Sequence, residues 1–444
     1  MTRWHAEYAW LGDRFVPDVV IEADNSVFTA VTPSVGGPPA GAVRLPGLTL
    51  PGLANAHSHA FHRVLRGRAQ AGRGSFWTWR EHMYRVAGRL IPDIYLRLAR
   101  ATYAEMALAG VTCVGEFHYL HHGPGGQPYD NPNAMADALF EAARQAGIRI
   151  TLLDTLYLSG GMGRALEGPQ LRFGDGSAEA WADRVDAIAP PAHARLGCAI
   201  HSVRAVPLGS MAPVVSWSQH NGAPLHVHLS EQRAENEACL DRYRRTPTQL
   251  LDEAGALGPR TTVVHATHLT DVDITKLGGA RVFVCMCPTT ERDLADGIGP
   301  ARALAHQGAT LTLGTDSHAM IDMFEEARAV ELNERLRSEA RGHWTAAELL
   351  GSATAAGHAS LGWPDAGVIA AGAQADLVTL DLSSVRLAGA SRDTPVESVI
   401  FSATAADVRH VVAGGHDVVR DGGHLLVSDV AGELDQVIGE VLAG

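Results

Sequence analysis

The chain has 444 residues, of which 46% are hydrophobic, and a formal net charge of −13 at pH 7. This negative charge argues against a nucleic-acid-binding protein, because contacts with phosphates need a basic face. No apolar stretch approaches the length of about 18 residues that a membrane span needs. Residues 1–19 also lack a basic segment followed by an apolar one, so we expect neither a membrane protein nor a signal peptide.

The cysteine pattern bears on the compartment of the protein. The five cysteines are odd in number and form no C-x-x-C pair, so the sequence does not predict a disulfide framework. We therefore expect a protein of the reducing cytoplasm. The chain is also longer than one hydrophobic core usually covers, unless that core belongs to an α/β barrel.

Short β-like runs alternate with helical runs from residue 48 onward. The β-like runs begin at Leu48, Thr112, Arg149, Ala194, Pro224, Thr261, Arg281 and Thr310. Most of them are rich in Val, Ile, Leu and Thr, and several are apolar almost throughout. This composition is typical of parallel strands that are covered on both faces.

Helix signals lie between these runs. Pro92 suits the first turn of a helix that Gly110 ends, and Gly147 ends another helix that begins near Asn133. Eight β-then-α units, some of them partial, predict a (β/α)8 TIM-like barrel of the α/β class. A doubly wound open sheet is the alternative.

The two ends of the chain differ from this pattern. Residues 1–47 and 370–444 carry short strand-like pieces separated by Gly-rich turns. We predict that both termini form one small β-sandwich domain and that residues 48–369 form the barrel between them.

Polar side chains that can do chemistry follow the predicted strands. Active sites of (β/α)8 enzymes lie at the C-terminal ends of the strands. The residues found there are His57, His59, Glu116, His118, Tyr119, His201, Arg204, His226, His228, Glu231, His265, His268, Asp316 and His318.

The His57-x-His59 pair is the first candidate for a metal site. Residues i and i+2 of a strand point to the same side about 6.6 Å apart, so both imidazoles can reach one ion. In isolation such a pair is equally well read as ordinary strand-end polarity. Histidines and carboxylates at the other strand ends favour the metal site.

Some of these positions leave a choice between neighbours. Within "HVHLSE", His228 lies nearer the barrel mouth and is the better ligand, whereas His226 fits a supporting role. For His268 and His318 we prefer hydrogen-bonded core histidines. Glu231 lies close enough to His228 to move protons without binding the metal.

Several motifs together resemble the amidohydrolase superfamily. They are "PGLANAHSH", the His-x-x-Glu at 228–231, "HATH" and "GTDSH". The absence of a lysine after the fourth predicted strand resembles the mononuclear deaminase branch of that superfamily. The stretch "GVIAAGAQADLVTLD" is similar to its terminal β-sandwich, so the resemblance covers essentially the whole chain.

Further stretches resemble the formimidoylglutamate deiminase family of bacterial histidine breakdown. These are "SFWTWREHMYR", "EFHYLHH", "HSVRAV", "HVHLSEQ", "HATH" and "PTTE" followed by "DGI". The resemblance implies one Zn²⁺ per subunit held by His57, His59, His228 and Asp316. It implies catalytic roles for Glu231, His265 and Asp316, and substrate contacts from His62, Arg80, Tyr119, His201 and Arg204.

Three residues depart from the family pattern. His62 stands where the family often has Gln, which puts that substrate contact in question. Arg292 and Asp293 stand where smaller or neutral residues are expected, and we interpret them as solvated loop charges. Arg80 is expected in a long loop after the first barrel strand.

The implied reaction converts N-formimidoyl-L-glutamate to N-formyl-L-glutamate and ammonia. Asp316 would accept a proton from the metal-activated water, His265 would orient that water, and Glu231 would protonate the leaving nitrogen. Two arginines suit a substrate with two carboxylates, because each guanidinium offers paired, planar donors.

Other interpretations stay open at this point. One is a deaminase of a purine, pyrimidine or related ring, and another is a hydrolase that releases formamide and glutamate. A third is a metal-binding scaffold without turnover. Imidazole and carboxylate ligands also suit Fe or Mn, and a homodimer is the commonest assembly for such a protein.

Overall fold

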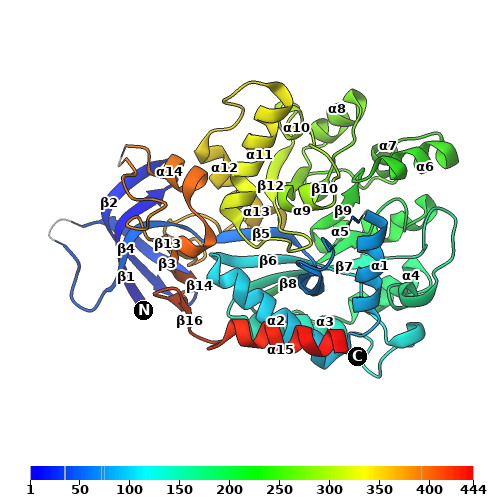
Figure 1. Cartoon of the computed structure of the whole chain (residues 1–444), viewed down its shortest axis with the longest axis horizontal. Coiled ribbons are helices and arrows are strands. Elements are labelled where there is room, and N and C mark those ends of the chain that lie inside the picture. Colours follow the sequence, from blue (N-terminus) through cyan, green and yellow to red (C-terminus); the bar gives the residue numbers. More distant parts are fainter. Residues whose placement is uncertain (1, 35–36, 72, 75, 392, 444) are drawn as a thin grey trace.

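The computed structural model describes residues 2–34, 37–71, 73–74, 76–391 and 393–443. Two sheets lie side by side: one is curled into a barrel surrounded by helices, and the other gathers strands from both ends of the chain (Figure 1). Within these described ranges, no helix is both long and apolar enough to cross a membrane.

The barrel sheet has eight parallel strands within the described residues. They are β5 (Leu53–Ser58), β6 (Val111–His118), β7 (Arg149–Leu156), β8 (Ala194–Ile200), β9 (Leu225–Leu229), β10 (Thr261–His265), β11 (Phe283–Met286) and β12 (Thr310–Leu313). Each strand pairs with the next one along the chain. Nearly all their residues are buried, since helices cover the outside and side chains fill the inside. The predicted (β/α)8 fold is confirmed.

Helices follow most of these strands. They are α1 (Phe76–Ala87), α2 (Pro92–Leu108), α3 (Ala134–Ala146), α4 (Ala178–Asp186), α5 (Met211–Asn221), α6 (Arg233–Tyr243), α7 (Pro247–Glu253), α8 (Asp271–Gly279), α9 (Pro288–Asp293), α10 (Ala301–His306), α11 (Met323–Ser338), α12 (Ala346–Ala353) and α13 (Ala355–Ser360). Short 3-10 helices are η1 (Ala60–Leu65), η2 (Pro124–Gly126), η3 (Gly168–Arg172) and η4 (Leu208–Ser210). Pro92 opens α2 and Gly147, with φ +75°, ends α3, as predicted.

The seam between the first and last barrel strands lies at the mouth. An isolated parallel bridge joins Ser58 of β5 to Asp316, which follows β12. The Asp316 N–H donates to the carbonyl of His57 at 3.0 Å, and its own carbonyl accepts from the His59 N–H at 3.2 Å. This closure brings the His57-x-His59 pair beside Asp316, although some 260 residues separate them.

The second sheet joins the two ends of the chain. Its strands are β1 (Thr2–Leu11), β2 (Arg14–Asp24), β3 (Val27–Pro33), β4 (Val43–Pro51), β13 (Leu377–Leu380), β14 (Val408–Ala413), β15 (His416–Arg420) and β16 (Gly423–His424). Their order is β16-β15-β14-β13-β4-β1-β2-β3. Neighbours are antiparallel except for β1 and β4. The contact between β4 and β13 unites the two termini.

The apolar run predicted as the first barrel strand is divided between the sheets. Residues 48–51 belong to β4, whereas the barrel strand begins at Leu53. Gly52 lies between them, and its N–H donates to the carbonyl of Asp376 at 3.1 Å. A Cβ at Gly52 would lie 2.5 Å from Thr112 Oγ1, so this crossing has no room for a larger residue. A continuous apolar run does not reveal such a division.

The C-terminal segment also contains helices that the sequence did not predict. After η5 (Ala405–Asp407) and the last strands, α15 (Val430–Ala443) lies along α2 (Figure 1). Arg97 of α2 pairs with Glu440 of α15 at 2.7 Å. Upstream of these strands, α14 (Pro395–Ser402) packs against α11 and α12. We propose that residues 1–47 and 370–444 form the small β domain and that residues 48–369 form the barrel domain.

A buried ion network beside β7 should make stability depend on pH. Arg184 donates to Asp175 at 2.7 Å and to Asp154 at 2.8 Å, and His122 donates to Asp175 at 3.0 Å. Burial alone would raise the pKa of Asp175, but these hydrogen bonds outweigh it and hold the pKa well below its usual range.

The Asp175→Asn variant tests this network. Breaking a buried ion pair costs about 3–5 kcal/mol of the free energy of unfolding, so we expect a loss of that order at pH 7. A carboxylate with a depressed folded-state pKa stabilises above its unfolded pKa of about 3.9 and loses that contribution as the pH falls further. Urea unfolding of both proteins at neutral pH and near pH 3 should show the gap narrowing in acid. A gap that stays constant or widens would contradict the assignment.

Candidate metal and active site

Four donor side chains meet at the mouth of the barrel. His57 and His59 come from the end of β5, His228 from β9, and Asp316 from the turn after β12. His57 Nε2 lies 3.2 Å from Asp316 Oδ1 and 3.1 Å from His228 Nε2, and His59 Nε2 lies 3.3 Å from Asp316 Oδ1. All four side chains are buried. The structure thus brings together the ligand set that the resemblance implied.

Hydrogen bonds fix which ring nitrogen faces this cluster. His59 Nδ1 donates to the carbonyl of Phe117 at 3.0 Å, and His228 Nδ1 donates to the carbonyl of His201 at 2.9 Å. The proton therefore sits on Nδ1, and each Nε2 directs a lone pair at the cluster. Burial lowers the pKa of His57, His59 and His228, which favours the neutral imidazoles that metal binding requires.

The donor set fits a divalent metal ion. Burial alone would raise the pKa of Asp316, but its hydrogen bond with His57 and the neighbouring imidazoles hold that pKa well below the usual range. A tetrahedral ion with bonds of about 2.0–2.1 Å separates its donors by roughly 3.4 Å, close to the spacing seen here. Lone pairs this close repel one another unless a proton or a metal cation lies between them. Three imidazoles and one carboxylate suit zinc, and also iron or manganese.

Unusual backbone conformations direct side chains toward the mouth. Among the described non-glycine residues with positive φ are Ser230 (51°), His265 (69°), Ala266 (49°), Asp316 (44°) and His318 (56°). Each such conformation costs on the order of 1–3 kcal/mol and persists only where the surroundings impose it. All five follow or end β9, β10 and β12, so the chain turns sharply where the strands leave the barrel.

Two further predicted residues lie beside the donor cluster. His265 Nε2 is 3.8 Å from Asp316 Oδ2 and 4.0 Å from Glu231 Oε1. Burial alone would lower the pKa of His265, but the carboxylates of Glu231, Glu291 and Asp316 hold it well above its ordinary value. His265 therefore stands between Glu231 and the metal ligand, where it can orient a polar group that both carboxylates also reach.

Glu291 was not assigned a role from the sequence. It lies in the first turn of α9 and accepts a hydrogen bond from the Cys287 N–H at 2.8 Å. The same oxygen lies 3.4 Å from His265 Nδ1, so Glu291 fixes the orientation of that ring. The motif "PTTE" contained this residue, but only the structure places it behind His265.

The predicted substrate-binding residues surround a narrow cavity of about 50 Å³ above the cluster. Its walls include His62, Arg80, Tyr119, His201 and Arg204. Glu231, His265 and Asp316 also line it. The cavity therefore joins all three predicted groups of residues in one place.

The wall residues are held by neighbours. His62 shares a 3.0 Å hydrogen bond with the hydroxyl of Tyr119, and burial lowers the pKa of His62 to about 3. Arg204 Nε lies 3.2 Å from Glu235 Oε2. Glu235 Oε1 in turn accepts from the Ser230 N–H at 3.1 Å. Glu235, another residue that the sequence analysis missed, links Arg204 to the turn that carries Glu231.

The prediction that Arg80 lies in a loop is wrong. Arg80 belongs to α1, where Nε donates to the hydroxyl of Tyr84 one turn later at 2.6 Å. Trp79, Met83 and Val86 recur at helical spacing and face the protein, which is the pattern of an amphipathic helix. The segment after the first barrel strand was predicted to be one long loop, although this spacing favours a helix.

The spare histidines lie outside the ligand cluster. His226 Nε2 donates to the carbonyl of Ser360 at 3.2 Å. His318 bonds to Ser58 at 3.1 Å and to Thr315 at 2.9 Å. Both are hydrogen-bonded core histidines, as preferred for His318.

The two unexpected charges lie on the surface. Arg292 donates to Glu325 at 3.0 Å, and Asp293 accepts from Gln70 at 2.7 Å. Both residues belong to α9 rather than to a loop. Their placement agrees with solvated charges but corrects the predicted local structure.

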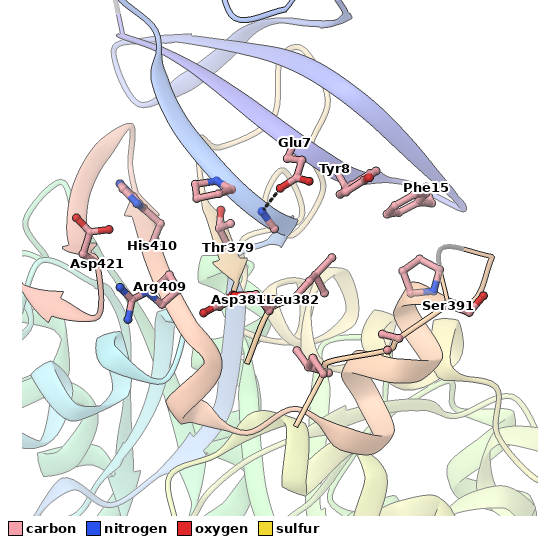
Figure 2. A pocket seen from close by; sticks show the side chains of 17 residues that line it. Glu7, Tyr8, Phe15, Thr379, Asp381, Leu382, Ser391, Arg409, His410 and Asp421 are labelled. Carbon is pink, nitrogen blue, oxygen red and sulfur yellow. Dashed lines mark hydrogen bonds between the residues drawn. The ribbon is translucent and has the colours of Figure 1, made fainter. Parts of the chain in front are cut away.

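A larger cavity of about 500 Å³ lies elsewhere, between the terminal sheet and the segment that follows β13 (Figure 2). Tyr8 and Phe15 stack on one wall with ring centroids 4.6 Å apart. Glu7 accepts a hydrogen bond from the Gly47 N–H at 2.9 Å. None of the predicted site residues, all of which are described, lines this cavity, so we place the chemistry at the barrel mouth.

Comparison with known proteins shows the family of the chain. Residues 48–418 match the Amidohydrolase family, and the chain therefore belongs to the amidohydrolase family. The predicted class, a hydrolase that acts on C–N bonds, is confirmed.

Individual relatives cover most or all of the chain. It is 37% identical to the formimidoylglutamate deiminase of Pseudomonas aeruginosa over 458 aligned residues, which cover 100% of both chains. It is 30% identical to the 8-oxoguanine deaminase of the same organism, over 84% of this chain and 83% of that one. The crystal structure of an amidohydrolase from Brucella melitensis superposes with a TM-score of 0.92 at 32% identity, covering 100% of both chains.

Proposed function

We propose that the protein is a metal-dependent deiminase that hydrolyses N-formimidoyl-L-glutamate to N-formyl-L-glutamate and ammonia, as a step of histidine degradation. One observation carries this proposal. The His₃Asp donor cluster presents His59, His228 and Asp316 to the same cavity that the Glu231–His265 pair and two arginines line. The full-length similarity to the deiminase of P. aeruginosa supports it.

For the metal, we propose one zinc ion per chain, held by His57, His59, His228 and Asp316. Neutral imidazoles and an ionised carboxylate are the ligand forms that such an ion binds. When bound, a divalent ion lowers the pKa of a water molecule toward neutrality and so supplies a nucleophile. Iron or manganese would be the alternative ions.

Residues of the chain would then move the protons. Asp316 Oδ2 faces His265, so this carboxylate can accept the proton of the attacking water while His265 holds the water in place. Glu231 lines the same cavity, with Oε1 4.0 Å from His265 Nε2, and would deliver a proton to the nitrogen that leaves as ammonia. Addition of water to the C=N carbon and loss of ammonia leaves the formyl C=O.

Arg80 and Arg204 would hold the two carboxylates of the substrate. Tyr119, His201 and His62 add neutral hydrogen-bonding groups to the same walls. Because the cavity measures only about 50 Å³, binding a diacid of this size requires side chains of its wall to move apart. The arginine pair is the feature that a neutral ring would not need.

A deaminase of a purine or related ring is the second candidate. The 30% identity to an 8-oxoguanine deaminase favours it, and such an enzyme would use the same metal and acid–base groups. A substrate panel distinguishes the two candidates.

We expect ammonia release from N-formimidoyl-L-glutamate and little or none from 8-oxoguanine or adenosine, measured with a coupled ammonia assay. Product analysis should identify N-formyl-L-glutamate. Formamide and glutamate would show cleavage of the other C–N bond. Faster turnover of a ring substrate would contradict the proposal and favour the second candidate.

We also propose a cytoplasmic homodimer. Light scattering coupled to size-exclusion chromatography would measure its mass against the 47.0 kDa of one chain.

A further inference from the structure

Glu116 is a buried acid that the proposed reaction does not use. It lies in β6, and its side chain has no exposed surface. Glu116 does not line the substrate cavity. Its carboxylate instead lies beside the segment that carries His57 and His59.

Both carboxylate oxygens of Glu116 hold this segment. Oε2 accepts from the Ser58 hydroxyl at 2.7 Å, and Oε1 accepts from the Ala60 N–H at 2.7 Å. These two donors flank His59, and Ser58 lies between the two histidine ligands. One rigid side chain therefore fixes the backbone on either side of His59.

The local structure explains why such support is needed. Ala60 opens η1, and the residue before it, His59, makes no side-chain cap to that helix. Helix N-termini leave backbone N–H groups without partners, and a buried one is costly unless an acceptor is supplied from elsewhere. The pairing of β5 with β6 also shifts register between Asn55 and Ser58. Glu116 supplies the acceptor at this irregular strand end.

The hydrogen bonds extend from Glu116 across the seam to the turn that carries Asp316. Because the Ser58 hydroxyl donates to Glu116, it accepts from His318 Nε2 at 3.1 Å. His318 Nδ1 must then accept from the Thr315 hydroxyl at 2.9 Å. Thr315 Oγ1 accepts in turn from Asn55 Nδ2 at 2.7 Å.

We infer that Glu116 is a positioning residue for the metal centre. It ends a directional hydrogen-bond chain that runs from Asn55 through Thr315, His318 and Ser58, and this chain fixes the segments of β5 and of the Asp316 turn relative to each other. The inference rests on the metal site of the proposed function, but it does not depend on the substrate.

Metal affinity tests this inference directly. Loss of groups that support metal ligands typically weakens binding by 10- to 100-fold, so we expect Glu116→Ala to raise the Kd for Zn²⁺ by about that factor. The measurement is competition between apo-protein and a chromophoric chelator. The visible spectrum of bound Co²⁺ should also change, because the ligand geometry is altered. Glu116→Gln, which keeps one acceptor oxygen, should recover most of the affinity.

Glu331→Ala is the matched control. Glu331 is equally buried and accepts from the N–H groups of Gly342 and Trp344, at 3.1 and 2.8 Å, but it lies in α11 away from the ligands. We expect this control to bind Zn²⁺ like the wild type. If Glu116→Ala binds Zn²⁺ like the wild type, or if Glu331→Ala loses as much affinity, the inference is wrong.

Two further results distinguish a wrong inference from a misfolded variant and from a wrong proposed function. If circular dichroism shows that Glu116→Ala does not fold, Ser58→Ala cuts the same chain while leaving the bond to Ala60. A smaller loss of Zn²⁺ affinity is then expected, and unchanged affinity would overturn the inference. If the wild-type chain itself binds no divalent ion, the proposed function fails.

Discussion

Replacing Glu231 by Gln should leave the metal bound and lower kcat for ammonia release by about 10²–10⁴-fold. Gln has nearly the same shape as Glu but cannot take up and deliver a proton. Glu231 is not among the proposed metal ligands, and its Oε1 lies 4.0 Å from His265 Nε2, so the donor cluster should survive the substitution. Steady-state kinetics together with metal analysis of the same sample measures both effects.

Glu237→Gln is a suitable control for this variant. Glu237 is exposed on α6, a short distance along the chain, and its substitution removes the same charge outside the cavity. Wild-type kcat is expected for this control. Normal turnover in Glu231→Gln, or loss of its metal, would contradict the assigned role.

Arg204→Gln should show the second large effect, on substrate binding. Truncating one partner of a buried charge pair costs about 2–5 kcal/mol, which corresponds to roughly 30- to 4,000-fold in kcat/KM. We expect most of this loss to appear as a higher KM for N-formimidoyl-L-glutamate, because Arg204 lines the cavity without reaching the donor cluster. Kinetics over a range of substrate concentrations separates KM from kcat.

Part of that loss would come from Glu235, which Arg204→Gln leaves buried without its partner. The double variant Arg204→Gln/Glu235→Gln removes this contribution and should still show a high KM. Arg233→Gln, at an exposed position of α6, should behave like the wild type. A wild-type KM in the double variant would show that Arg204 does not hold the substrate.

The barrel could be predicted from the sequence because its signal is repetitive. Each strand is a short apolar run, and Pro92 and Gly147 mark helix ends by well-understood backbone constraints. The division of residues 48–58 between two sheets could not be predicted in the same way. Both halves are apolar and extended, and they are separated by strand pairing: β4 pairs with β1 and β13, whereas β5 pairs with β6.

The donor residues could also be predicted from the sequence, because strand ends gather at the barrel mouth. The roles of the residues that support them could not. Glu291 lies against His265, and Glu235 pairs with Arg204, a partner distant in the chain in both cases. Glu116 was among the strand-end residues, but the sequence does not indicate that it accepts from Ser58 and Ala60. Their sequence signal is a single Glu, which is usually an exposed charge. Only the three-dimensional contacts distinguish these buried acids from surface ones.

Metal stoichiometry, determined by mass spectrometry of purified protein after exposure to Zn²⁺ and removal of free ions, tests the central claim most directly. The account predicts one divalent ion per wild-type chain and almost none in a folded Asp316→Ala variant. A folded wild-type protein that retains no ion, or an Asp316→Ala protein that retains a full equivalent, would contradict it.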